Sequence, residues 1–190
     1  MRLEPGDIFA CYGPDWISRA ISLQTSSPFG PRRLRWAPCH VAIALDVSGE
    51  LLWCESTALC GHPCYLTGTH VRGCQAHEAY YRINDYRQAG GRVDVYRLTG
   101  INSLSGTEAR LLGDVFRRHF IAKRVAYDFA GAAISGTRVW KWLPFVPANV
   151  LDTLFCSELI AALLMRVGRV RRCNPTVYSP GKLMRELVQT

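Results

Sequence analysis

The chain of 190 residues lacks several features that would place it in a specialised class of protein. No apolar run approaches the ~20 residues that a membrane-spanning helix needs. No charged-then-apolar leader opens the sequence, because residues 1–6 lead directly into an expected strand. Internal repeats and low-complexity tracts are also missing. We therefore expect a single domain over residues 1–190, located in the cytoplasm of the producing cell, with export by another route left open.

Acidic side chains are the scarcer charged type, with 15 Asp and Glu against 23 Lys and Arg and a formal charge of +8. Such a balance favours anionic partners, namely phospholipid surfaces, nucleic acid or acidic substrates. The sequence carries no helix-turn-helix, no zinc-finger spacing and no ribonucleoprotein-type aromatic signature. We therefore interpret the charge first as a solvated surface and second as a face that docks on an anionic surface. No specific nucleic-acid partner is expected.

Cysteine is plentiful, with eight in the chain. Disulfides would require an oxidising compartment, which no leader segment supports. Soft metal ligands crowd into residues 54–77, but no C-x2-C pair occurs there, so the spacing matches no standard zinc knuckle. These ligands are Cys54, Cys60, His62, Cys64, His70, Cys74 and His77. We favour reduced cysteines packed as small hydrophobic residues in a loop, with no metal and no cofactor. A structural zinc is the open alternative.

Cys156 lies at the expected start of a helix. Apolar residues recur after it at three- and four-residue steps, and Gly168 follows as the expected residue just past the helix end. Asp152 or Thr153 can serve as N-cap, which places Cys156 in the first turn. That position favours the thiolate, which is the nucleophilic form of cysteine. The competing interpretation is an ordinary buried cysteine.

A candidate base and a carboxylate stand on an expected β-hairpin, with His40 near the start of its first strand and Glu55 near the end of its second. The turn can centre on residues 47–48 or on residues 48–49. Side chains alternate along a strand, so both registers place Glu55 on the face of His40. A cysteine nucleophile, a histidine base and a carboxylate that orients the imidazole form a generalised catalytic triad.

The remaining pattern predicts an α+β fold, in which a small antiparallel sheet packs against helices. Strands are expected over residues 6–12 and 91–98. A helix over residues 15–24 carries an apolar stripe that would face the core, formed by Trp16, Ile17, Ala20 and Ile21. Ser105 and Glu108 form a capping-box signature ahead of a further helix with apolar residues at helical spacing up to Phe120.

Five short motifs occur along the chain in an order that is characteristic of a known family. In chain order they are Gly6-Asp7-Ile8, His40-Val41-Ala42-Ile43, Glu55, Tyr127-Asp128-Phe129 and Phe155-Cys156-Ser157-Glu158-Leu159. Their types and order resemble the circularly permuted NlpC-type papain-like hydrolases, the YiiX-like group, with lecithin retinol acyltransferases as more distant relatives. In ordinary papain-like enzymes the cysteine precedes the histidine, whereas here the histidine strand comes first.

The resemblance covers the chain roughly from residue 6 to residue 180. It implies a permuted papain-like fold with Cys156 as nucleophile, His40 as base and Glu55 as the orienting third residue. It also implies that Tyr127 lies near the site. Residues 61–77, which are crowded with Cys and His, and the Trp-rich stretch that precedes Cys156 are not features of that family.

The Trp-rich stretch, residues 139–147, is strongly apolar and is broken by two prolines, which make a long helix unfavourable. It can be a loop that covers the core, a segment that touches a membrane, or one wall of a substrate groove. We place Trp140, Trp142 and Phe145 at the groove, as a hydrophobic substrate-binding subsite.

Taken together, the residues predict a cysteine hydrolase, amidase-like or peptidase-like, that cleaves an amide or ester bond through a thioester acyl-enzyme. The oxyanion would meet the backbone N–H of Cys156 and the hydroxyl of Tyr127. The resemblance implies peptide, cell-wall peptide or acyl-lipid substrates. An acyltransferase or lipid-acyl hydrolase with the same site stays open. So do two non-enzymatic alternatives, a binding module that keeps the groove and a zinc-stabilised interaction protein.

Overall fold

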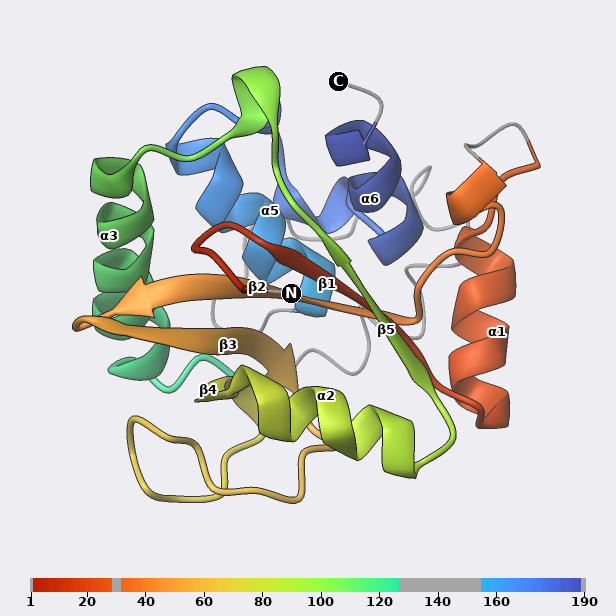
Figure 1. Cartoon of the computed structure of the whole chain (residues 1–190), viewed down its shortest axis with the longest axis horizontal. Helices are drawn as coiled ribbons and strands as arrows, with labels where there is room; N and C mark the ends of the chain where they lie inside the picture. The colour runs from red at the N-terminus through yellow and green to blue at the C-terminus, as the bar shows by residue number, and fades with distance from the viewer. Residues whose placement is uncertain (1, 29–31, 127–154, 189–190) are drawn as a thin grey trace, which may run out of the picture.

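The computed structural model describes residues 2–28, 32–126 and 155–188. Its centre is a five-stranded antiparallel sheet in the order β4-β3-β2-β1-β5, with helices on both faces (Figure 1). The strands are β1 (Ile8–Tyr12), β2 (His40–Val47), β3 (Glu50–Thr57), β4 (Gly73–Glu78) and β5 (Arg92–Tyr96). The expected α+β class and antiparallel sheet are confirmed.

Strand β2 occupies the middle of the sheet, and its position explains its composition. A strand covered on both faces has no solvent side, so it becomes a nearly continuous apolar run instead of alternating. The five residues from Val41 to Leu45 are accordingly all buried. His40, the first residue of the strand, is the polar exception at its N-terminal end.

The turn between β2 and β3 selects one of the two expected registers. Val47 pairs with Glu50, and the turn residues Ser48 and Gly49 both have positive φ, 60° and 90°. Two positive φ values are the requirement of a type I′ hairpin turn, whose twist matches that of the strands. The side chain of Asp46 accepts a hydrogen bond of 2.9 Å from the Gly49 N–H. Glu55 is thereby held diagonal to His40.

Five α-helices lie within the described residues: α1 (Trp16–Thr25), α2 (Ala79–Gln88), α3 (Gly106–Val115), α5 (Cys156–Arg166) and α6 (Pro180–Val188). Helices α3 and α5 pack on one face of the sheet through the larger hydrophobic core, and α2 covers the other face. No helix among the described residues combines the length and the apolarity needed to cross a membrane.

Helix α3 begins as the sequence predicts. The Ser105 side chain accepts the Glu108 N–H at 3.2 Å, and Glu108 accepts the Ser105 N–H at 2.8 Å. The helix continues as a π-helical turn over Phe116–Ile121. Gly113 lets it approach the sheet, because a Cβ at that position would clash with the carbonyl of Asp46. The small residue therefore sets how closely α3 lies on β2.

Helix α1 forms where expected, with the Asp15 side chain capping its first turn at 2.9 Å. Its apolar stripe does not face the core, however, because Trp16 is 77% exposed and Ile17 is 49% exposed. The buried positions are instead Ser22 and Thr25. Helix α6 comes close to α1 at Gly181, where an added Cβ would clash with the Thr25 carbonyl oxygen. The apolar stripe of α1 therefore did not predict its packed face.

The Cys- and His-rich segment that follows the hairpin is not all loop, contrary to what the sequence suggested, because its last part forms strand β4 against β3. All eight cysteines are free, and Cys54, Cys64 and Cys74 are buried in the larger hydrophobic core. For these three, packing as small hydrophobic residues is confirmed. Cys60 differs, because it is only partly buried and lies in the loop between β3 and β4.

Candidate active site

Cys156 is the first residue of α5 and therefore lies in the first turn of the helix, as the sequence predicts. The N-cap is Phe155, and neither Asp152 nor Thr153, because the Glu158 carboxylate reaches back to accept the Phe155 N–H at 2.9 Å. The first N–H groups of a helix have no acceptor within the helix and carry partial positive charge. Cys156 therefore sits at the positive end of α5.

The far end of α5 follows the sequence prediction. Gly168 has a φ of 70°, its N–H donates to Met165, and the Arg169 N–H donates to Leu164. These two hydrogen bonds form the Schellman motif, which satisfies the last carbonyls of a helix. Helix α5 is thus fixed at both ends, which holds Cys156 at a defined position relative to the sheet.

His40 and Glu55 meet as the hairpin parity predicts. His40 Nε2 lies 2.7 Å from Glu55 Oε2, and the Glu55 side chain is fully buried. The carboxylate therefore fixes the orientation of the imidazole and leaves its other nitrogen, Nδ1, for a second partner. Cys156 lies near the imidazole and raises the pKa of His40 through charge and hydrogen bonding.

The charges of this cluster stabilise one another. Burial alone lowers the pKa of His40, but Cys156 and Glu55 outweigh it and raise that pKa to about 10. Burial alone raises the pKa of Glu55, but the neighbouring Arg82 guanidinium and His40 hold it far below its usual range. An imidazolium between a cysteine sulfur and a carboxylate is therefore the favoured protonation state at neutral pH.

Arg82 is the residue that sequence reasoning missed. Its Nε donates to Glu55 Oε1 at 2.8 Å, and its Nη1 donates to Asp85 Oδ2 at 2.9 Å. Arg82 is buried, and burial alone would lower its pKa, but the Glu55 carboxylate outweighs this effect and raises the pKa. It lies on α2, 27 residues from Glu55 along the chain, and no local sequence motif predicts the contact. Only the packing of α2 on the sheet brings it to the carboxylate.

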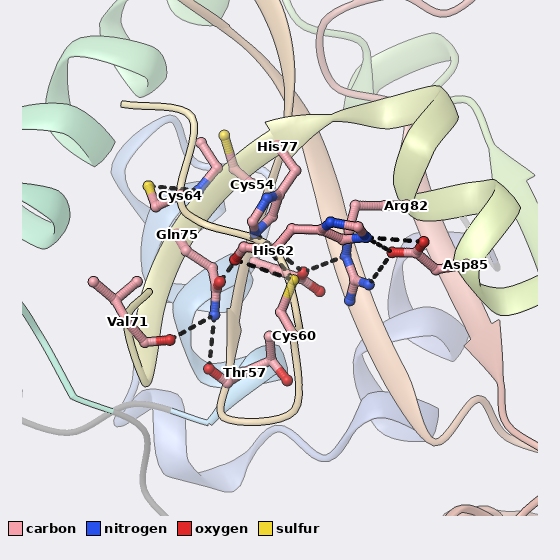
Figure 2. A network of polar contacts seen from close by, with 12 residues as sticks. Cys54, Thr57, Cys60, His62, Cys64, Val71, Gln75, His77, Arg82 and Asp85 are labelled. Carbon is pink, nitrogen blue, oxygen red and sulfur yellow. Dashed lines mark hydrogen bonds and ion pairs between the residues drawn. The ribbon is translucent and has the colours of Figure 1, made fainter. Parts of the chain in front are cut away.

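A second cysteine–histidine pair, Cys60 and His77 (Figure 2), lies beside the same carboxylate. Cys60 Sγ is 3.4 Å from His77 Nε2, which is 4.0 Å from Glu55 Oε1. One ligand atom from each of these three residues lies within 4.8 Å of the others, so the group could hold a metal ion. Burial raises the pKa of Cys60 and lowers that of His77, so this pair is neutral.

Four of the sequence-predicted site residues lie outside the described residues. They are Tyr127, Trp140, Trp142 and Phe145. Their places at the oxyanion and in a hydrophobic subsite stay predictions. The structure brings together the other three, Cys156, His40 and Glu55, in the order sulfur, imidazole, carboxylate. Chemically, such a row can activate a thiol, hold an imidazolium and return its proton to a leaving group.

The fold is similar to that of a solved structure described as the metalloprotein YiiX from Escherichia coli O157:H7, DUF1105. The two superpose with a TM-score of 0.56 and 15% sequence identity, over 90% of this chain and 69% of that chain. A likeness at this identity concerns the fold alone. No family model matches the sequence, and no curated protein matches it significantly.

Proposed function

We propose that the protein is a cysteine hydrolase that cleaves an amide or ester bond by acyl transfer to Cys156. One observation carries this proposal: the side chain at the positive end of α5 interacts with an imidazole whose opposite nitrogen is held by a buried carboxylate. Cysteine, histidine and carboxylate in this row are the parts of a nucleophile, a proton carrier and an orienting group.

The proposed reaction has two halves. The Cys156 sulfur attacks the substrate carbonyl carbon, a C–S bond forms, and His40 gives its proton to the departing amine or alkoxide as the C–N or C–O bond breaks. Water then attacks the thioester carbon, His40 accepts a proton from the water, and the C–S bond breaks, which releases the carboxylic acid and restores Cys156 and the His40 imidazolium. Glu55 forms no covalent bond and keeps the imidazole in position. In this proposal the backbone N–H of Cys156 donates to the oxyanion.

We further propose that the fold is the circularly permuted papain-like one of the NlpC type. The order of the segments supports it, because the histidine strand β2 precedes the cysteine helix α5. The fold likeness to YiiX agrees with the group that the sequence resembles. On this assignment peptide, cell-wall peptide or acyl-lipid carbonyls are the substrate classes. An acyltransferase would use the same site, with another nucleophile in place of water.

The decisive experiment traps the acyl-enzyme. The full chain is mixed with p-nitrophenyl acetate and with p-nitrophenyl octanoate, then quenched in acid and analysed by intact mass and peptide mapping. We expect one acyl group on Cys156 and a burst of p-nitrophenol. The variant Cys156→Ala should show neither. Cys173→Ser is the matched control, because Cys173 is exposed and distant in sequence from the cluster.

An acyl group on Cys173 or Cys60, with Cys156 unmodified, would contradict the proposal. So would a burst that survives in Cys156→Ala. Comparing the acetate with the octanoate tests the hydrophobic subsite, because a groove that binds an acyl chain should give the longer ester the higher kcat/KM. Adding a primary amine or an alcohol separates hydrolysis from transfer, since a transferase would pass the acyl group to it.

A further inference from the structure

The ring nitrogen Nε2 of His77 faces more acceptors than one proton can serve. Gln75 Oε1 lies 3.0 Å from it and Cys60 Sγ lies 3.4 Å from it (Figure 2), while Glu55 Oε1 lies at 4.0 Å. The Gln75 amide cannot turn to offer a donor instead, because its Nε2 already donates to the Thr57 carbonyl at 2.8 Å. A single N–H can satisfy only one of these atoms.

We propose that Cys60 Sγ, His77 Nε2 and Glu55 Oε1 bind a divalent cation of borderline softness, zinc above all, with Gln75 Oε1 beside it. A cation at their centre would use the lone pairs that a proton cannot satisfy together. Thiolate, imidazole and carboxylate are the donors that zinc accepts, and three protein ligands with a fourth position free is a recurring arrangement.

The distances fit such a site. Zinc holds sulfur at about 2.3 Å and imidazole nitrogen at about 2.0 Å, so a tetrahedral site separates the two by roughly 3.5 Å. The observed separation of Cys60 Sγ and His77 Nε2 is 3.4 Å. A carboxylate oxygen would lie roughly 3.4 Å from the nitrogen, and Glu55 Oε1 now lies at 4.0 Å. Closing the site needs only a small shift of side chains.

Charge and access fit as well. Once its S–H proton has passed to solvent and an S–metal bond has formed, Cys60 carries a negative charge. Glu55, Asp85 and this thiolate then carry three negative charges against the two positive charges of Arg82 and the His40 imidazolium, so a net negative charge remains to attract a divalent cation. Glu55 and His77 are buried while Cys60 is partly exposed, so the cation enters from the side of the Cys60 loop.

Arg82 does not block this use of Glu55. A carboxylate oxygen has two lone pairs, so Oε1 can accept the Arg82 N–H and ligate a metal together. Ligating carboxylates are ordinarily hydrogen-bonded by a second layer of side chains. Here Arg82 and His40 supply that layer from the two oxygens of Glu55. The cation site is thus separate from Cys156, and it stands whether or not Cys156 acts as a nucleophile.

The test uses the full chain, stripped with a chelator and then dialysed against Zn2+. Elemental analysis should find about one zinc per chain. Replacement by Co2+ should give the absorption of a thiolate–cobalt bond, which identifies sulfur as a ligand. Cys60→Ser and His77→Gln should each weaken zinc binding on the order of 100-fold or more, because each removes a direct ligand. Circular dichroism checks that both variants remain folded.

Three controls make the assignment specific. Cys156→Ala removes the other cysteine near Glu55, His62→Gln removes the histidine nearest to Cys60 in sequence, and Cys173→Ser removes an exposed thiol. All three should keep the zinc. The proposal is overturned if the stripped chain takes up no stoichiometric zinc, or if Cys156→Ala or His62→Gln loses the metal while Cys60→Ser retains it. Cys60 is a partly exposed loop residue, so its variant keeps the test valid even if His77→Gln fails to fold.

Discussion

Two cysteine–histidine pairs share one buried carboxylate, yet their surroundings give them opposite electrostatics. His40 is hydrogen-bonded to Glu55 at 2.7 Å, and its pKa is raised. His77 reaches the same carboxylate only at 4.0 Å, and burial lowers its pKa. Equal residue types thus give a charged imidazole on one oxygen of Glu55 and a neutral imidazole beside the other. Hydrogen-bond geometry, and not residue type, separates a candidate nucleophile from a candidate metal ligand set.

The largest expected difference between the pairs is in acyl transfer. His40→Ala should lower kcat/KM for p-nitrophenyl acetate on the order of 10⁴-fold, because the variant loses both proton carrier and thiolate partner. His77→Ala should lower it far less, and His119→Ala, which changes an exposed histidine outside both pairs, serves as the control. Equal losses in the His40 and His77 variants would erase the distinction between the pairs.

Arg82 supports both pairs through Glu55, so its removal should reveal how much stability depends on that carboxylate. Arg82→Met should lower the free energy of unfolding by about 3–5 kcal/mol, because it leaves a buried charge without its partner. Adding Glu55→Gln should restore a large part of that loss. Arg92→Met, which breaks the exposed pair with Asp94, should cost under about 1 kcal/mol.

Urea denaturation of the four proteins measures these effects. Similar losses for Arg82→Met and Arg92→Met would show that the buried network is not a structural support. A double variant as unstable as Arg82→Met alone would show that the loss does not come from the stranded carboxylate.

The raised pKa of His40 predicts the pH dependence of its contribution to stability. The folded protein binds this proton more tightly than the unfolded chain, whose histidine titrates near 6.5. The contribution is therefore fully present below about pH 6.5 and is lost as the pH rises through about 10. In chelator-containing buffer, the stability difference between wild type and His40→Gln should shrink over that interval. A difference that grows with pH would mean that the native imidazole is neutral.

The smallest expected effects come from two glycines, one in the loop that carries Cys60 and one at the end of α5. Gly68 and Gly168 have φ of 66° and 70°, and neither has an atom within 4 Å of an added Cβ. Ala at either position should cost about 1 kcal/mol, which is the backbone penalty alone. Only Gly68→Ala should also weaken zinc binding. Thermal unfolding measures the loss of stability of both variants, and zinc titration measures their zinc affinity. If both variants lose the same zinc affinity, the Cys60 loop has no special role in metal binding.

How much of the site could be predicted from the sequence depended on how far apart along the chain the interacting residues lie. Strand alternation was enough to bring Glu55 to the face of His40, because both allowed turns preserve parity. The capping residues of α3 and the glycine at the end of α5 could be predicted from local sequence motifs. Each of these depends on contacts between residues close in sequence or across one hairpin, and such patterns are written directly in residue order.

Contacts between residues that are far apart along the chain could not be predicted in this way. Cys60 and His77 look irregularly spaced along the chain, and they meet only because β4 pairs with β3 and places His77 opposite Trp53. Arg82 reaches Glu55 through the packing of α2. The outward stripe of α1 misled for the same reason, since which side of a helix is buried depends on its neighbours and not on its own pattern.

The sharing of Glu55 has a thermodynamic consequence. Oε2 serves the His40 proton, and Oε1 faces the proposed cation position. Two ligands on one carboxylate are coupled, and coupling between binding equilibria is reciprocal. If an occupied cation position weakens proton binding at His40 by some factor, then protonation of His40 weakens cation binding by the same factor. A pH titration of His40 therefore reports on cation binding, and a cation titration reports on the protonation of His40.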